Sequence, residues 1–376
     1  MDMKKYCLFA LAAGCMLLAG CSGGSGSNEV PVIDMASGVE MSDAPELVYT
    51  DIEYVPLDTA TAALLGEYSN IMAVMGDTII MHDMDWMGGD SRLLLFSLAD
   101  GRFIREIKHI GQGPGEYSWI ESIFPDRGKG DIVIKGANNA IGRYTLSDSL
   151  VSSKTIASLA NNKFAVGSLV NGVNVAEPIE GNLLIHQYDA EFNVVDTLFV
   201  PDYEPRFISM AINTSYDKGL INVFDTVYNL LPGRMDPVVI LSRGDKALTP
   251  KVEQDVYLNQ KDYKLGQEMR KRYIEFAKFD IVGDQFIVFY YYGGNNYCDI
   301  YSLTDGKLLG RCKFTWQDGG FELPWGDTTF QLRTIPFYAG DGRFYMKVDD
   351  EQAIDADGNQ NPDGNVGIIS FRIARP

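Results

Sequence analysis

The chain contains few of the residues on which the best-marked catalytic sites depend. It has only three histidines, His82, His109 and His186, and they stand far apart in the sequence. It also lacks the HExxH and CxxC patterns that mark zinc hydrolases and zinc or redox sites, and after residue 24 it lacks the GxSxG pattern of serine hydrolases. These absences exclude locally encoded sites of those classes, although a Ser-His-Asp triad assembled from distant residues stays open.

Positive charge is scarce as well. The 32 lysines and arginines are outnumbered by 51 aspartates and glutamates, which gives a formal net charge of -19. Such a chain repels phosphate backbones and anionic lipid surfaces, so we expect no nucleic-acid partner. The acidity suits cationic partners or divalent metal ions, and it equally serves solubility alone.

No apolar run is long enough for a membrane-spanning helix. The run over residues 6–18 follows Lys4 and Lys5 and is typical of an export signal. The stretch LAGC, which ends at Cys21, resembles the lipobox of bacterial lipoproteins, in which the cysteine becomes the lipidated first residue after cleavage. We therefore expect a signal peptide over residues 1–20, lipidation of Cys21 and contact with a membrane of the cell envelope through the lipid anchor only. An ordinary signal peptide with a chance cysteine is the alternative.

Cysteine is nearly absent from the rest of the chain. The polar stretch SGGSGSNE predicts a flexible tether over residues 21–45, followed by a folded domain over residues 46–376. That domain holds only Cys298 and Cys312, which flank a turn at Asp305-Gly306 in one expected hairpin. They could pair in an oxidising periplasm, but cross-strand geometry is often poor for a disulfide, so their pairing stays open.

The domain consists of short strand-like runs, and turn dipeptides recur along it. The clearest helix candidate is residues 259–277. Six turns, each followed by a strand-like run, lie at residues 76–77, 130–131, 181–182, 218–219, 283–284 and 340–341. A repeat of about fifty residues is close to the four-stranded blade of a β-propeller. The sequence therefore predicts an all-β, six-bladed β-propeller. The alternative is a pair of β-sandwiches, which rarely repeat at about fifty residues, or an open meander.

The two ends of the domain complement each other. The sixth unit ends after GIISFRI, at residues 367–373, without a fourth strand, whereas LVYTDIEYVPLDT, at residues 47–59, alternates like a strand ahead of the first unit. We therefore expect this N-terminal strand to complete the last blade and close the ring, which leaves few open sheet edges.

Particular stretches resemble a known family. GEYSNI at residues 66–71 recurs as GEYSWI at residues 115–120, within IGQGPGEYSWI. With DIEYVPLD, RLLLFSLADGRFIREI and DTVYNL, this motif resembles the six-bladed β-propeller lipoproteins of Bacteroidota, which are related in fold to TolB-like and NHL-like propellers. The resemblance covers roughly residues 45–376. It implies the fold and export, and it carries over no catalytic residues because the family's activity is largely unassigned.

The GQGPGEY stretch predicts a loop between two blades. Its three glycines allow close backbone approach, and Gln112, Glu116 and Tyr117 are candidates for a binding site at the rim of the central channel. A packing interpretation competes with this one: Glu116 caps backbone amides and Tyr117 packs between blades. The recurrence of GEYS favours packing, since a spacing device repeats more readily than a binding residue.

Other expected inter-blade connections supply further rim candidates. Arg206 belongs to PDYEPRF, and Arg272 belongs to the basic stretch RKRY, which could meet an anionic ligand. Asp318 and Trp325 belong to WQDGGFELPW, an aromatic stretch that suits carbohydrate stacking. A solvated helix end and aromatic packing between blades are the respective alternatives.

An acidic stretch near the C-terminus suggests one cofactor. DADGNQNPDGN places oxygen ligands at alternate positions, Asp355, Asp357, Asn359 and Asn361. An EF-hand loop requires Gly at the sixth position and Glu at the twelfth, where this chain has Gln360 and Val366. The stretch is therefore either a calcium loop or a hairpin loop rich in turn formers, and no other cofactor is indicated.

These observations favour a monomeric, exported, lipid-anchored propeller that binds a protein or small-molecule ligand, including carbohydrate, through its loop-rich channel face. One alternative is a propeller hydrolase or lyase with a divalent metal at the channel mouth, and another is an architectural subunit of an envelope complex. His82 and His186 both end strands that run toward second-to-third turns, so we expect both on one face.

Overall fold

The computed structural model describes most of the chain after residue 28. The described residues are 29–58, 60, 64–66, 69–85, 90–138, 140–155, 164–169, 172–179, 182–200, 212–214, 219–247, 268, 271–314, 321–332, 336–340, 342–348, 353–354, 357 and 366–374. Their regular elements are strands, apart from the one-turn helix α1 (Met35–Gly38) and the 3-10 helix η3 (Gly244–Lys246). The predicted all-β class is confirmed.

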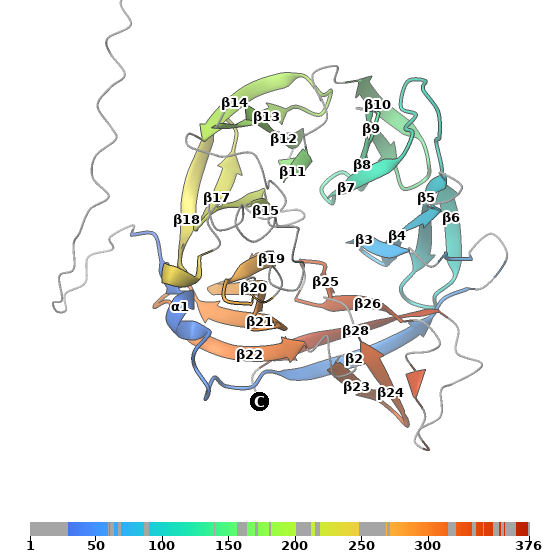
Figure 1. Ribbon diagram of the computed structural model, residues 1–376. Helices are drawn as coiled ribbons and strands as arrows, with labels where there is room; N and C mark the ends of the chain where they lie inside the picture. Colours follow the sequence, from blue (N-terminus) through green and yellow to red (C-terminus); the bar gives the residue numbers. More distant parts are fainter. Residues whose placement is uncertain are drawn as a thin grey trace, which may run out of the picture.

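The described strands form five four-stranded sheets, one five-stranded sheet and one three-stranded sheet. Figure 1 shows the larger sheets arranged around a central axis, with β3, β7, β11, β15, β19 and β25 nearest to it. The fold is therefore a β-propeller, as the sequence predicts.

The strands of these sheets follow in chain order, from the axis outward. The first sheets are β3 (Asn70–Met75), β4 (Thr78–Asp85), β5 (Asp90–Ser97) and β6 (Phe103–Ile107); β7 (Ile120–Asp126), β8 (Asp131–Gly136), β9 (Ala140–Thr145) and β10 (Leu150–Thr155); and β11 (Phe164–Leu169), β12 (Gly172–Ile179), β13 (Asn182–Tyr188) and β14 (Val194–Val200). The next are β15 (Ile212–Thr214), β16 (Leu220–Val223), β17 (Thr226–Leu231) and β18 (Arg234–Ser242), extended by β1 (Val32–Asp34); and β19 (Glu275–Val282), β20 (Gln285–Tyr292), β21 (Asn295–Ser302) and β22 (Leu308–Phe314). The last is β25 (Phe337–Tyr338), β26 (Phe344–Val348), β28 (Gly367–Ala374) and β2 (Val48–Pro56).

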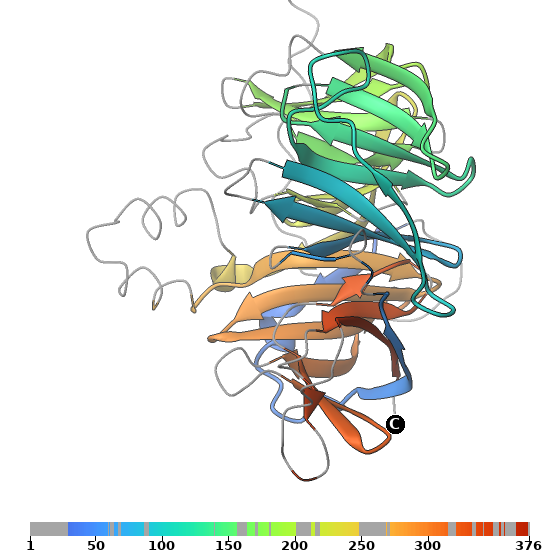
Figure 2. The ribbon, with the colours of Figure 1, turned by 90° about the vertical axis from the view of Figure 1, so that its right-hand side faces the viewer.

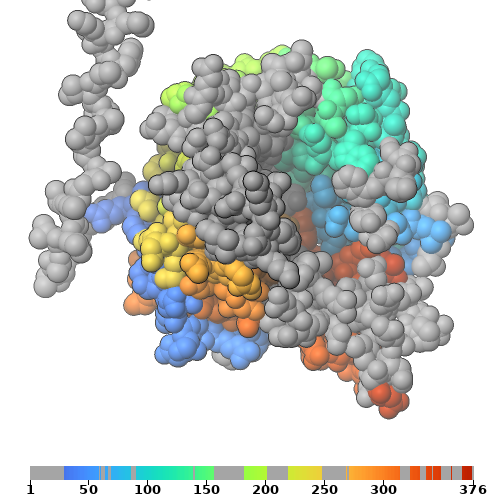
Figure 3. All heavy atoms as spheres, viewed as in Figure 1, coloured from blue at the N-terminus to red at the C-terminus, as the bar shows by residue number. Residues whose placement is uncertain are grey.

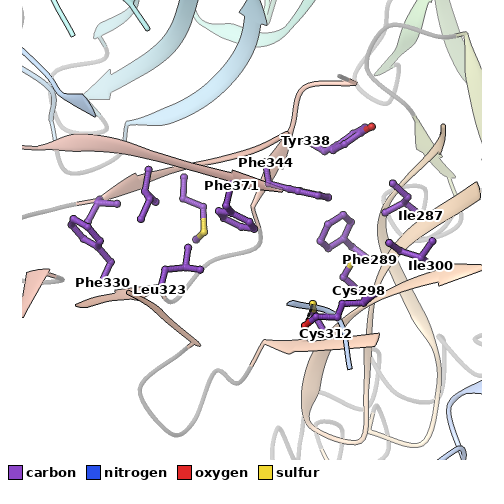
Figure 4. Close-up of a cluster of buried hydrophobic side chains, with 14 residues drawn as sticks. Ile287, Phe289, Cys298, Ile300, Cys312, Leu323, Phe330, Tyr338, Phe344 and Phe371 are labelled. Carbon is purple, nitrogen blue, oxygen red and sulfur yellow. Dashed lines mark hydrogen bonds between the residues drawn. The ribbon is translucent and has the colours of Figure 1, made fainter. Parts of the chain in front are cut away.

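Apolar faces of neighbouring sheets pack together to form the core. In Figure 4, Phe289 from the β19–β22 sheet lies against Phe344 and Phe371 from the sheet of β25, β26, β28 and β2, with ring centroids of Phe289 and Phe344 5.6 Å apart. Burying an aromatic or large aliphatic side chain of this kind contributes about 1.5–3 kcal/mol. Strands such as β8, whose six residues are all buried, contribute both faces to the core, whereas the end of the outer strand β18 alternates between buried and exposed residues.

The glycines of the recurrent turns explain why the repeat could be recognised in the sequence. Gly76, Gly130 and Gly283 have φ values of 57°, 72° and 61°, a region that glycine enters without strain, and each lies between the first and second strands of its sheet. The turn at residues 181–182 is different, because β13 begins at Asn182 and this turn joins the second and third strands. β12 was not predicted from the sequence, because its eight residues include Pro178, and proline is unfavourable within a strand.

The N-terminal segment is ordered over part of the predicted tether. Residues 32–38, assigned by sequence to the flexible tether, instead form β1 and α1, and β1 pairs in parallel with β18 through Ile33 and Leu241. Ile33 and Met35 are fully buried in the core between β17 and β21, which is the reason the segment is fixed. The tether prediction is therefore wrong for these residues.

The segment continues along the outside of the propeller, and we call residues 31–57 the strap. Glu46 bridges in parallel to Arg311 of β22, and β2 then pairs antiparallel with β28, with Val55 opposite Ile368. The strap thus follows β18 and β22 in turn and then becomes the outermost strand of the next sheet, beside β28. Figure 1 and the space-filling view of Figure 3 show these blue residues lying against the yellow and orange strands.

Two regions differ from a plain repeat. The strands β23 (Phe321–Trp325), β24 (Thr328–Leu332) and β27 (Ala353–Ile354) form the three-stranded sheet, which stands outside the ring in Figure 2 and contacts β2. The helix predicted over residues 259–277 is wrong at its end, because residues 275–277 begin β19. Most of its remainder lies outside the described residues.

Among the residues that the structure describes, no helix has the length and apolar character needed to cross a membrane.

Candidate functional site

Strand order divides the propeller into two unlike faces. Apart from β1, neighbouring strands of each sheet are antiparallel, so the connections from an outer strand to the next inner strand begin and end at one end of the propeller, which we call the connection face. These connections are residues 57–69, 108–119, 156–163, 201–211 and 243–274. The opposite end, the turn face, carries short turns such as residues 76–77 and 283–284.

The GQGPGEY loop, residues 111–117, lies in one of these connections, and its glutamate points back into the loop. Glu116 Oε2 accepts a hydrogen bond from the Gly113 amide at 2.7 Å. The Glu116 carboxylate also fills the space beside Gly111 that any side chain there would need. Glu116 therefore holds the loop closed, as the packing interpretation predicts.

Tyr117 packs between two sheets and is only 1% exposed. Its ring joins Ile107 and Ile132 in the core between the β3–β6 and β7–β10 sheets, and its hydroxyl accepts a hydrogen bond from the His109 amide at 3.2 Å. Burial raises the pKa of Tyr117 well above its usual value. A ligand cannot reach this side chain, so its assignment to a binding rim is wrong.

The rest of the loop is also held against the outer part of the next sheet. The Tyr144 hydroxyl donates to the Gly115 carbonyl, and the His109 ring stacks on Tyr144 with centroids 4.9 Å apart. His109 Nε2 lies 2.7 Å from Asp148 Oδ1 in the turn between β9 and β10. The loop is therefore a wedge that sets the spacing of two sheets, and of its predicted binding residues only Gln112 is exposed.

The other predicted rim residues do not gather at one place. Arg272 is exposed and lies on the connection face. It stands two residues before Ile274, which forms an isolated bridge with Ala247 just ahead of β19. Trp325 is 41% exposed at the turn of the β23–β24 hairpin, where its ring packs 5.3 Å from Tyr54 of β2. Because this hairpin stands outside the ring (Figure 1), the assignment of Trp325 to the channel rim is wrong.

Several predicted residues cannot be placed. Of the proposed calcium loop the structure describes only Asp357, which is exposed. The predicted residues that lie outside the described part of the chain are Cys21, Arg206, Asp318, Asp355, Asn359 and Asn361. Within the described part, no group of three or more His, Cys, Asp or Glu side chains could hold a metal ion.

His82 contacts a serine that was not predicted as a site residue from the sequence. His82 Nε2 lies 2.8 Å from Ser91 Oγ, which also accepts the Ile120 amide at 3.1 Å. Burial lowers the pKa of His82, and Ser91 is fully buried. The nearby Asp83 is held by Arg92 and the Gly66 amide. This arrangement ties β4 and β5 to β7 and offers no accessible nucleophile.

His186 departs from the expectation that it shares a face with His82. It lies on β13, the third strand of its sheet, which runs toward the turn face, whereas β4 runs toward the connection face. Its Nδ1 is 3.1 Å from Thr197 Oγ1. The expectation failed because β12 was missed, which shifted the strand count by one.

A lysine on an innermost strand was also missed. Lys278 of β19 is half-buried, with Nζ 5.5 Å from the centroid of the Phe337 ring on β25. Burial lowers its pKa to about 8. The lysine follows Ile274 and Phe276 at alternate positions of the strand-like run YIEFAKFDIV, and this place on an apolar face was the signal that could have found it. On the turn face, Arg127 donates to the Ala339 carbonyl and so joins two turns beside the axis.

Comparisons with known proteins support the fold. The family model described as a domain of unknown function, DUF4934, matches residues 30–359. A protein from Bacteroides fragilis NCTC 9343, named as an exported protein, is similar in structure with a TM-score of 0.56 and 15% identity over 92% of this chain and 99% of that chain. A DUF4221 family member from Bacteroides vulgatus has a TM-score of 0.52 and 12% identity over 89% and 100%. No curated protein matches the chain.

Proposed function

Because the chain belongs to the DUF4934 family and has a propeller fold, we propose that it is an exported, lipid-anchored binding protein that recognises a ligand or partner protein through its connection face. The observation that carries this proposal is the difference between the two faces. Connections such as residues 243–274 are far longer than turns such as residues 283–284. Binding residues are found disproportionately on loops that a rigid scaffold positions.

Export and anchoring are supported by the start of the chain and by one structural neighbour. The apolar run before Cys21 has the form of a signal peptide, and the Bacteroides fragilis protein is named as exported. A lipid on Cys21, followed by the polar residues 22–28, would leave the propeller free of the membrane surface. The fold would then meet its partner in the cell envelope or outside it.

We also infer that the ring has six blades and is closed by β2. Three observations support this inference. β2 lies in the outermost position beside β28, and GEYS occurs both between β2 and β3 and between β6 and β7, the two corresponding connections.

The third observation concerns the junctions between sheets. The amide of Asp58, the residue that follows the strap, donates to the Gly101 carbonyl at the turn between β5 and β6. The side-chain ammonium of Lys154 on β10 donates to the Phe192 carbonyl at the corresponding turn between β13 and β14. At both junctions, a residue of the outer strand or next to it contacts the turn before the last strand of the following sheet. The contact at Gly101 therefore matches an ordinary junction between neighbouring sheets.

The test of the binding proposal places a photocrosslinking amino acid at one exposed position on each face. Arg272 serves for the connection face and Lys129, in the turn between β7 and β8, serves for the turn face. In cells that produce the full chain, we expect an adduct from position 272 and none from position 129. Adducts from position 129 alone, or from neither position, would contradict the proposal.

A further inference from the structure

Cys298 and Cys312 lie directly opposite each other on β21 and β22, and both are buried free thiols. They belong to the same core cluster, which Figure 4 shows beside Phe289. Opposite positions on antiparallel strands bring Cα atoms to roughly 4.5 or 5.5 Å, depending on the pair type.

The hydrogen bonds between the strap and β22 show whether Cys298 and Cys312 form a hydrogen-bonded or a non-hydrogen-bonded pair. The Arg311 amide donates to the Pro45 carbonyl at 2.8 Å, and the Arg311 carbonyl accepts the Leu47 amide at 3.0 Å. Backbone groups point to opposite sides at successive residues of a strand, so those of Cys312 point inward to β21. Cys298 and Cys312 are therefore a hydrogen-bonded pair, with a Cα separation of about 5.5 Å, inside the range of about 4.4–6.8 Å that disulfides span.

The docked strap also covers the sulfurs. Cys312 Sγ donates to the Leu47 carbonyl at 3.7 Å, and the Leu47 side chain, itself buried, rests where a side chain on Gly310 would lie. Burial raises the pKa of Cys298 well above its usual value and that of Cys312 to about 12. Because the thiolate is the form that reacts, the two thiols are protected once the strap is in place.

We propose that Cys298 and Cys312 form a cross-strand disulfide while the chain folds in the presence of a disulfide oxidant, before the strap docks on β22. The thiolate of one cysteine attacks a sulfur of the oxidant and expels a thiol, and the thiolate of the other cysteine then attacks the mixed disulfide and expels a second thiol. The two cysteines together lose two protons and two electrons, and the oxidant is reduced to two thiols. The docked strap then shields the bond from reductants.

The first test refolds the chain from residue 21, with Cys21→Ser, from denaturant with a mixture of oxidised and reduced glutathione. We expect the product to lose the mass of two hydrogen atoms and to take up no iodoacetamide when it is denatured again. Cys298→Ala is the control and should keep one alkylatable thiol. Alkylation of both cysteines, or a stable glutathione adduct on either, would overturn the proposal.

A second test asks whether the docked strap protects the two cysteines, and it does not use the Cys298→Ala variant. The same chain, folded without oxidant, is exposed to Ellman's reagent as Leu47→Ala and as Val48→Ala, whose side chain is already partly exposed. We expect about a tenfold or greater increase in thiol reaction rate for Leu47→Ala alone, because truncating a buried leucine weakens strap docking. Equal rates in the two variants, or rapid reaction of the parent chain, would show that the strap does not protect the pair.

Discussion

The guanidinium of Arg311 holds the carboxylate of Asp299 with two nitrogens, Nε 2.7 Å from Oδ1 and Nη2 2.7 Å from Oδ2. Asp299 is fully buried and also accepts the hydroxyls of Tyr290 and Tyr301. The same guanidinium donates to the Gly38 carbonyl at 2.9 Å. One ion pair therefore joins the β19–β22 sheet to the strap.

Replacing Arg311 should destabilise the protein strongly. Arg311→Ala leaves the Asp299 carboxylate buried without its cation, and breaking a buried pair in this way costs about 3–5 kcal/mol of unfolding free energy. Denaturant unfolding measures this loss. Arg102→Ala is the matched control, because Arg102 pairs with Asp100 at 3.9 Å on the surface, and it should leave the unfolding curve unchanged. Similar curves for the two variants would contradict the assignment.

The GQGPGEY wedge predicts coupling between Glu116 and Gly111. Glu116→Ala removes the acceptor of the Gly113 amide, and Gly111→Ala pushes the same carboxylate away, so each should cost about 1–2 kcal/mol. Because both changes remove one interaction, the double variant should lose about 1 kcal/mol less than the sum. Denaturant unfolding of the three variants measures the cycle.

Gly128→Ala is the control for the glycine change, since a methyl group there would meet its nearest neighbour at an ordinary 3.6 Å. It should alter stability little. Strict additivity of Glu116→Ala and Gly111→Ala would mean that the carboxylate does not hold the loop.

Lys278 predicts a particular pH dependence. Burial lowers its folded-state pKa from 10.5 to about 8, so between these values the unfolded chain holds a proton that the folded chain has released. Stability from this group therefore rises with pH across that window and is lowest below pH 8. The total effect is at most about 3 kcal/mol.

Lys278→Met removes this titration. Its unfolding free energy relative to the parent chain should fall as pH increases from about 7 to about 10, because only the parent gains stability from the loss of the proton. Lys313→Met, at an exposed position of β22, should show no such trend. Parallel pH profiles for the parent and Lys278→Met would contradict the prediction.

Local patterns were sufficient to predict much of the fold. Alternating apolar residues and left-handed glycines such as Gly76 and Gly130 are encoded within a few residues, so the strands and turns on either side of them could be predicted from the sequence. β1 could not, because three residues after a glycine-rich stretch become a strand only by pairing with β18. Burial of Ile33 depends on residues some two hundred positions away.

The candidate site shows the same division. The repetition of GEYS correctly favoured packing over binding for Glu116, because a spacing device recurs with the repeat. The Ser91–His82 contact and the Arg311–Gly38 contact join residues whose proximity depends on sheet register and on the path of the strap. Neither has a local signal.

The inferred closure of the ring by β2 decides whether residues 57–69 connect two neighbouring blades, as residues 108–119 do. Thr50 and Arg372 are opposite each other on β2 and β28, so Thr50→Cys with Arg372→Cys tests closure through a short bismaleimide, with peptide mapping by mass spectrometry. Thr50→Cys with Lys154→Cys of β10 is the control. Closure predicts an intramolecular cross-link between positions 50 and 372 and none between 50 and 154; the absence of the first, or equal yields of both, would contradict it.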